Sequence, residues 1–125
     1  MLADIAFEER SGIQIARVRG EVDMSNAGEL GATLQGMIEQ LAAGLVLDFT
    51  DTTYLDSAGL HFIFDLAKRL RDRGQRLELV VPPGSPLAAT LDIVRVESLA
   101  PMSATLDDAV ATLQEHAADV PHDTL

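Results

Sequence analysis

The sequence predicts an α/β sandwich in which four helices pack on a mixed, mostly parallel sheet of four to five strands. Amphipathic segments alternate with short apolar runs in the order β-β-α-β-α-β-α-β-α. Alternating strands and helices favour a parallel sheet covered by helices. The 125 residues fit a single domain with one core. We expect this domain to span residues 1–118, followed by a flexible, polar C-terminal tail at residues 119–125.

The first third of the chain predicts a hairpin and a helix. Apolar clusters at Ile5–Phe7 and Ile13–Val18 flank the turn signal "ERSG". The next segment, "GEVDMSN", is expected to be a loop, in which Ser25 is the predicted N-cap of the helix. Apolar residues then recur at intervals of three and four from Ala27 to Leu41, which is the pattern of an amphipathic helix that ends near Gly44.

The middle of the chain predicts two buried strands around a second helix. The run "LVLDF", from Leu45, is continuously apolar apart from its acid, as is typical of a buried parallel strand. A loop is expected over Thr50–Leu55 and a helix over about Ala58–Arg73, with Gly74 as its stop signal. The run "LELVV", from Leu77, predicts the next strand.

The last third predicts two helices and a weak strand. Pro86 suits the first turn of a short helix that continues to about Ile93. A weak edge strand is expected near Leu99–Met102. Thr105, with an acid three residues later, resembles a capping box, and apolar residues at helical spacing follow it to Ala117.

The composition limits the classes of partner and compartment. The net charge of −11 and the pI near 4.4 argue against direct contact with nucleic acid or an anionic membrane, because both need a positive protein surface. The charge fits either a basic protein partner or simply a soluble acidic protein. The chain has no cysteine, and it contains no signal-like segment and no apolar run of about 20 residues. We therefore expect a cytoplasmic protein without membrane insertion.

The stretch "DSAG", Asp56–Gly59, lies where a strand is predicted to give way to a helix. Its serine could be a nucleophile, a helix cap or a residue that another protein modifies. A nucleophile elbow requires glycine two positions before the serine, and this position holds Leu55. His61 lies one turn along the same predicted helix and would not point at the hydroxyl of Ser57. The pattern therefore predicts no catalytic residues.

Other chemistry is also disfavoured. Asp48, Asp51 and Asp56 would allow only a weak Mg²⁺ site, and solvated loop carboxylates are the favoured interpretation. A phospho-aspartate receiver would need a lysine after a late strand, whereas Lys68, the only lysine, falls in a predicted helix. No glycine-rich phosphate loop is present. We expect no metal and no cofactor.

Ser57 itself is expected to cap the second helix, because serine at a helix start commonly accepts a hydrogen bond from a free backbone N–H group. It also follows the C-terminal end of a strand, which is the usual functional edge of such sheets. The small residues Ala58 and Gly59 are expected to leave room for the active site of another protein.

Three segments resemble a known family. The segment Leu45–Val80 reads "LVLDFTDTTYLDSAGLHFIFDLAKRLRDRGQRLELV" and resembles the signature of STAS domains, the family of anti-sigma factor antagonists. The segment "RGEVDMSNAGEL", from Arg19, is similar to the loop that precedes the first helix of the family. "SPLAATLDIVRVESLAPMSATLDDAV", from Ser85, is similar to its C-terminal part. The resemblance covers about residues 5–115 and implies a STAS-like sandwich.

The resemblance implies a regulatory rather than an enzymatic role. An unphosphorylated antagonist of this family binds an anti-sigma factor that is also a serine kinase, and so frees the sigma factor. The kinase phosphorylates the antagonist, the complex dissociates, and a PP2C-type phosphatase restores the first state. The resemblance makes Ser57 the phosphate acceptor. The expected partner-binding residues are Asp23, Met24, Ser25, Asp56, Ser57, Ala58, Gly59, Leu60 and His61.

Two expectations complete the sequence-based hypothesis. Phosphate on Ser57 would face free N–H groups at the helix start and would act locally, through bulk and charge, without large refolding. Ala58 replaces a second serine that is common in the family, which leaves one acceptor in the motif. The main alternatives are a STAS scaffold subunit of a lipid-transport ABC complex and a stressosome component. The long segment after Leu87 favours the antagonist.

Overall fold

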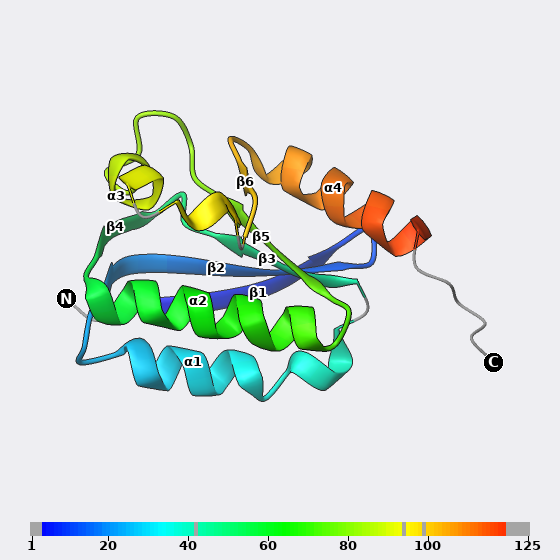
Figure 1. Ribbon diagram of the computed structural model, residues 1–125, viewed down its shortest axis with the longest axis horizontal. Coiled ribbons are helices and arrows are strands. Elements are labelled where there is room, and N and C mark those ends of the chain that lie inside the picture. The colour runs from blue at the N-terminus through cyan, green and yellow to red at the C-terminus, as the bar shows by residue number, and fades with distance from the viewer. Residues whose placement is uncertain (1–3, 42, 94, 99, 120–125) are drawn as a thin grey trace.

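Six strands form one mixed sheet with helices on both faces (Figure 1). The computed structural model describes residues 4–41, 43–93, 95–98 and 100–119. Its elements are β1 (Asp4–Arg10), β2 (Ile13–Val22), α1 (Ala27–Gln35), the 3-10 helix η1 (Ile38–Gln40), β3 (Gly44–Asp48), β4 (Thr52–Leu55), α2 (Ser57–Asp72), β5 (Arg76–Val80), α3 (Ala88–Ile93), the 3-10 helix η2 (Val96–Ser98), β6 (Met102–Ser103) and α4 (Leu106–Asp119). The predicted α/β class with four helices is confirmed.

The strand order is β1-β2-β3-β5-β6, and β4 pairs with β2 off this path. Only the β1–β2 hairpin is antiparallel, and its register aligns Phe7 with Ala16. Ser11 and Gly12 both have positive φ, 54° and 81°, which is the backbone conformation that a two-residue hairpin turn needs. The predicted hairpin and the mostly parallel sheet are therefore confirmed.

The long strand β2 determines where the functional edge of the sheet lies. Residues 14–17 of β2 pair with β3, whereas residues 20–22 pair with β4 after an irregularity at Gly20 and Glu21. Residues 20–22 had been predicted as loop. The prediction of a loop at Thr50–Leu55 is also wrong, because Thr52–Leu55 form the strand β4. The Thr52 hydroxyl donates to the Val18 carbonyl over 2.6 Å and helps to hold β4 beside β2. The sheet gains its sixth strand in this way.

The central strands are buried on both faces, as their continuous apolar runs predicted. One face packs against α1 and α2, and Leu91 of α3 joins the same apolar cluster. The strand residues of this face include Ala16, Val18, Leu45, Leu47, Leu77 and Leu79. The opposite face packs against α4 through Ile13, Ile15, Val46 and Val80. Val22 and Leu55, at the ends of β2 and β4, belong to the cluster on the α1–α2 side.

Several helix ends differ from the prediction. α1 stops at Gln35 rather than near Gly44, and the chain continues as η1, so that Ile38 and Leu41 are still buried. The N-cap position of α1 is Asn26 rather than Ser25. α2 matches the prediction within one residue at each end, and Gly74 follows it with a φ of 74°.

The C-terminal elements agree in part. The last strand is Met102–Ser103 instead of Leu99–Met102, and Leu99 lies outside the described residues. The Thr105 hydroxyl accepts from the Asp108 N–H over 3.1 Å at the start of α4, which confirms the predicted cap. The predicted tail begins at the last residue of α4, and residues 120–125 lie outside the described part of the chain. No described helix is long and apolar enough to span a bilayer.

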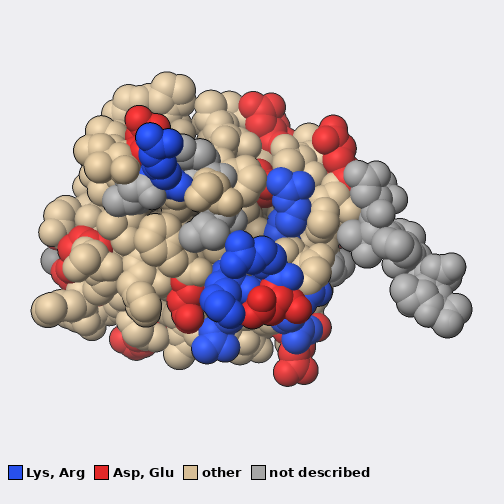
Figure 2. Space-filling view, in the orientation of Figure 1, with Lys and Arg blue, Asp and Glu red and all other residues tan. Residues whose placement is uncertain are grey.

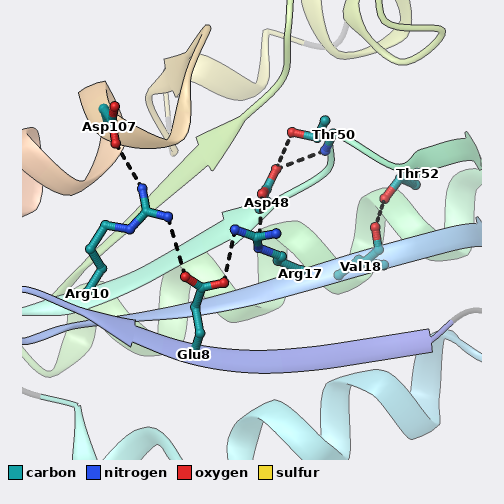
Figure 3. A network of polar contacts seen from close by, with 8 residues as sticks. All are labelled: Glu8, Arg10, Arg17, Val18, Asp48, Thr50, Thr52 and Asp107. Carbon is teal, nitrogen blue, oxygen red and sulfur yellow. Dashed lines mark hydrogen bonds and ion pairs between the residues drawn. The ribbon is translucent and has the colours of Figure 1, made fainter.

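A network of charged side chains lies on the α4 side of the sheet (Figure 3). Glu8 on β1 bridges Arg10 and Arg17 at 3.5 and 2.9 Å, and Arg10 reaches Asp107 of α4 at 2.8 Å. Arg17 also lies 3.8 Å from Asp48. Apart from the buried Asp48, these side chains are at least partly exposed to solvent, so each pair contributes little to stability. The Arg10–Asp107 pair links β1 to the start of α4.

The acidic residues considered as a weak Mg²⁺ site do not form one. The Asp48 carboxylate accepts from the Thr50 N–H and hydroxyl over 2.9 and 2.6 Å, in addition to its contact with Arg17. Among the described residues, no group of three or more acidic, histidine or cysteine side chains could hold a metal ion.

One carboxyl group is buried within the sheet. Glu78 on β5 is 1% exposed, and it lies on the α4 face because its neighbours Leu77 and Leu79 face the other side. Its Oε2 lies 3.3 Å from the Arg76 guanidinium, yet this atom makes no hydrogen bond to a described residue. Burial raises the pKa of Glu78 to about 7, against the opposing effect of Arg76.

This burial predicts an unusual pH dependence of stability. Since the pKa of Glu78 in the folded state, about 7, lies above the ordinary 4.5, folding favours the protonated carboxyl. Its contribution to the free energy of unfolding is therefore full below pH 4.5 and is lost as the pH rises to about 7, by up to about 3 kcal/mol. Glu78→Gln should abolish this loss and be more stable than the wild type at pH 8.

Urea denaturation at pH 5 and pH 8 would measure this effect. Glu39→Gln, at an exposed position of η1, removes the same charge without the burial and serves as the control. A wild type and a Glu78→Gln variant whose stabilities change in parallel between the two pH values would contradict the prediction.

Candidate functional site

The site lies at the edge where β2 and β4 end side by side. Val22 and Leu55 are paired in register, so the next residue of each strand, Asp23 and Asp56, reaches the same edge of the sheet. The Asp56 N–H donates to the Val22 carbonyl over 3.2 Å, which fixes this approach. The structure thus brings together two acidic residues that are 33 positions apart in the sequence.

The Asp56 carboxylate joins the start of α2 to the β2–α1 loop. Its Oδ1 accepts from the N–H groups of Ala58 and Gly59 over 2.9 and 3.1 Å, which makes Asp56 the N-cap of α2. Its Oδ2 accepts from the Met24 N–H over 3.2 Å. A single side chain therefore caps the helix and holds the neighbouring loop.

The β2–α1 loop is also held by its own polar residues. The Asp23 carboxylate accepts from the N–H and the hydroxyl of Ser25 over 2.9 and 2.5 Å, and these hydrogen bonds lower the pKa of Asp23. Asn26 is 6% exposed; its Oδ1 accepts from the Asp23 N–H, and its amide donates to the Glu21 carbonyl. The Ser25 hydroxyl therefore donates to Asp23 instead of capping α1 as predicted.

Ser57 is the first residue of α2 and is exposed. The prediction that it caps the helix is wrong, because Asp56, one residue earlier, already accepts the N–H groups of the first turn. The Ser57 hydroxyl makes no hydrogen bond to any residue that the structure describes. It is thus free of any role in holding α2.

Gly59 has a packing role. The residue is buried, and a Cβ atom there would collide with the Leu55 side chain and lie 3.1 Å from the Val22 carbonyl oxygen. Its lack of a side chain lets α2 approach the paired ends of β2 and β4 closely. The motif glycine therefore faces the interior rather than an approaching protein, contrary to the expectation from the sequence.

A groove of about 390 Å³ opens between α1 and α2 and begins at Ser57. Met24, Ala58 and His61 line it near the serine, and Phe62 and Leu66 lie deeper, both largely buried. Met24 is 84% exposed, which places an apolar, flexible side chain at the mouth of the groove. The remaining lining residues are Ala27, Gly28, Gly31, Gln35 and Asp65.

Most of the predicted partner-binding residues lie on one surface. Asp23, Met24, Ser25 and the segment 56–58 are contiguous at the edge of the sheet, with His61 on the next turn of α2. Leu60 is only partly buried, packs against the core and does not line the groove.

Sequence reasoning missed the α1 side of the groove. Gly28 and Gly31 interrupt a helical pattern, and this was a usable signal, because glycine weakens a helix interior unless something requires it.

The sequence model of one family, described as STAS domain, matches residues 4–109. The chain belongs to the STAS domain family. BtrV, a candidate anti-sigma factor antagonist of Bordetella bronchiseptica, is 33% identical to it over 67 residues, which are 54% of this chain and 58% of that protein. The STAS chain therefore matches little more than half the length of this curated relative.

Solved structures share the fold. An anti-sigma factor antagonist from Mycobacterium paratuberculosis gives a TM-score of 0.81 at 21% identity, with 90% of this chain and 95% of that one covered. The anti-sigma factor antagonist SpoIIAA in its unphosphorylated form gives 0.68 at 18% identity, with 89% and 98% covered. SpoIIAA of Bacillus in its phosphorylated form gives 0.64 at 16% identity, with 88% and 99% covered. These likenesses establish the STAS fold.

The geometry predicts unequal roles for the two residues of the Asp-Ser pair. Asp56→Ala removes three hydrogen bonds, including the two that cap the N-terminus of α2, and should lower the free energy of unfolding by about 1–2 kcal/mol. Ser57→Ala removes no hydrogen bond to a described residue and should change it by less than about 0.5 kcal/mol. Urea denaturation of the two variants and the wild type measures both values. An equal loss in the two variants would show that Ser57 shares the capping role.

Proposed function

We propose that this STAS protein is an anti-sigma factor antagonist that is switched by phosphorylation of Ser57. In its unphosphorylated form it binds an anti-sigma factor that is also a serine kinase, and a PP2C-type phosphatase reverses the modification. The observation that carries the proposal is the exposed Ser57 hydroxyl at the mouth of the α1–α2 groove, which makes no hydrogen bond to a described residue. The names of BtrV and of the Mycobacterium paratuberculosis structure support the antagonist role.

Ser57 has the properties of a good phosphate acceptor. Its side chain is exposed, its neighbour Ala58 is small, and its hydroxyl makes no hydrogen bond to a described residue that a kinase would have to break. No hydrogen bond connects this hydroxyl to His61 in the described structure, so the hydroxyl is not paired with this histidine as a nucleophile would be with its base. These features support a protein that acts by binding and is modified by others, rather than an enzyme.

The capping of α2 changes the expected action of the phosphate. The Ala58 and Gly59 N–H groups already bind Asp56, so a phosphate on Ser57 would compete with this carboxylate for them. The added charge of about −1.5 to −2 would also repel Asp56, which holds the β2–α1 loop through the Met24 N–H. Phosphorylation would thus place bulk and negative charge at the centre of the proposed binding surface without requiring a change of fold.

The magnitude required of the switch is modest. Loss of about 3–4 kcal/mol of binding free energy weakens an interface by about a hundredfold to a thousandfold. A doubly charged group that must be desolvated beside a carboxylate is sufficient for this. The proposed cycle is cytoplasmic and involves neither direct binding of nucleic acid nor insertion into a membrane.

Purified anti-sigma serine kinases from the source organism provide the test. With ATP, one of them should add a single phosphate to the wild-type protein, measured by intact mass, and none to Ser57→Ala. Ser57→Ala should bind this kinase in the presence of ATP as tightly as the wild type binds without ATP, whereas Ser57→Asp should bind at least about tenfold more weakly.

Ser25→Ala is the matched control, because Ser25 is an exposed serine of the same surface. It should still accept one phosphate. Phosphate incorporated into Ser57→Ala, or no binding to any of the kinases, would refute the proposal.

A further inference from the structure

The α1–α2 groove extends well beyond Ser57. A second hollow of about 340 Å³ lies farther along the two helices, and Gln35 lines both hollows. The second hollow is lined by Gln35, Ile38, Glu39, Arg69, Asp72 and Arg73. Over the 16 residues of α2 the two hollows form a track of about 24 Å.

Glycines in α1 keep the first hollow open. A Cβ atom at Gly28 would meet nothing within 4 Å, and one at Gly31 would meet only Phe62 Cδ1, at 3.6 Å. Neither glycine has a positive φ. Each costs the helix about 1 kcal/mol relative to alanine, and neither packing nor backbone geometry requires this cost. Together with the exposed Met24, they leave a partly apolar hollow beside Ser57, whose lining also includes Asp65.

The other end of the track lies beside a basic stretch of α2, although the second hollow itself is lined by two basic and two acidic residues, Arg69, Arg73, Glu39 and Asp72. Residues 65–73 contain four basic and two acidic residues, a net charge of +2, whereas the whole chain carries −11. Much of the basic surface in Figure 2 gathers over the C-terminal half of α2. Lys68 pairs with Asp72 and Arg69 with Asp65, at 3.0 and 3.2 Å.

Two basic residues line the second hollow, and Arg69 is already paired with Asp65. Arg73 is the one that can pair with a partner protein. It forms no ion pair with any described residue, although Glu39 lines the same hollow. A partner carboxylate could therefore pair with Arg73 without displacing an existing ion pair.

We propose that this track binds a segment of the anti-sigma kinase that places an apolar side chain in the hollow beside Ser57 and an acidic side chain next to Arg73. The inference rests on the proposed function and adds the chemistry of the partner. An apolar side chain suits the hollow lined by Met24 and Phe62, and a carboxylate can pair with the guanidinium of Arg73 in the second hollow. Recognition along the track is then separate from the switch at Ser57.

Binding measured by calorimetry, with the kinase that phosphorylates Ser57, tests the apolar end. Gly28→Leu fills the hollow and should weaken binding at least tenfold, while its melting temperature stays equal or rises, because leucine favours a helix more than glycine does. Ala32→Leu is the control. Ala32 is exposed on the same helix and does not line the groove, so binding should change less than twofold.

Charge reversal tests the other end. Arg73→Glu should weaken binding at least tenfold. Arg71→Glu makes the same change of net charge, but Arg71 lies beside Gln75 and Leu77, away from the track, so its effect should be less than threefold. Equal losses in the two variants would reveal only long-range attraction and would refute the acidic contact.

The outcomes separate the two proposals. If the wild type binds no anti-sigma kinase, the proposed function fails. If the wild type binds and is phosphorylated on Ser57 but Gly28→Leu binds as tightly as Ala32→Leu, the track is not the docking site and the function stands.

Discussion

The carboxylate of Asp56 is the interaction on which the functional edge depends. It accepts from two N–H groups of α2 and one of the β2–α1 loop, so the helix start and the loop have one fixed relative position. This arrangement requires β4 to run beside the end of β2, and it requires Gly59 for the close approach of α2. The position of Asp56 thus depends on the pairing of β2 with β4 and on the missing side chain of Gly59, and Asp56 in turn caps α2.

The two residues of the Asp-Ser pair have different roles: Asp56 stabilises the fold, and Ser57 is the proposed site of phosphorylation. Asp56 carries the capping contacts, whereas the Ser57 hydroxyl is bonded to no described residue. In the proposed cycle a kinase therefore modifies a group that the fold does not use, beside a group that the fold does use. In that cycle the charge on phosphoserine would act on the loop through Asp56, whose carboxylate accepts from the Met24 N–H.

The sequence predicted the α/β class, the hairpin, α2 and the motif at its start, because long periodic segments and continuous apolar runs report burial directly. It did not predict β4, since "TTYL" is short and lacks a clear pattern, and its place depends on the distant Val18 carbonyl. The caps at Ser25 and Ser57 were misassigned because a neighbouring residue of a type common at helix starts, Asn26 or Asp56, occupies the N-cap position instead. The groove was missed because it exists only once α1 and α2 lie side by side.

The two separate apolar clusters have a practical consequence. The face that bears α4 and the face that bears α1 and α2 pack through different side chains, and the sheet lies between them. In Figure 1 the end of α4 lies at the opposite side of the molecule from the start of α2. A fluorescent or affinity module joined beyond α4 would thus leave the Ser57 edge unobstructed, so this protein can be tagged at its C-terminal side for binding measurements in living cells.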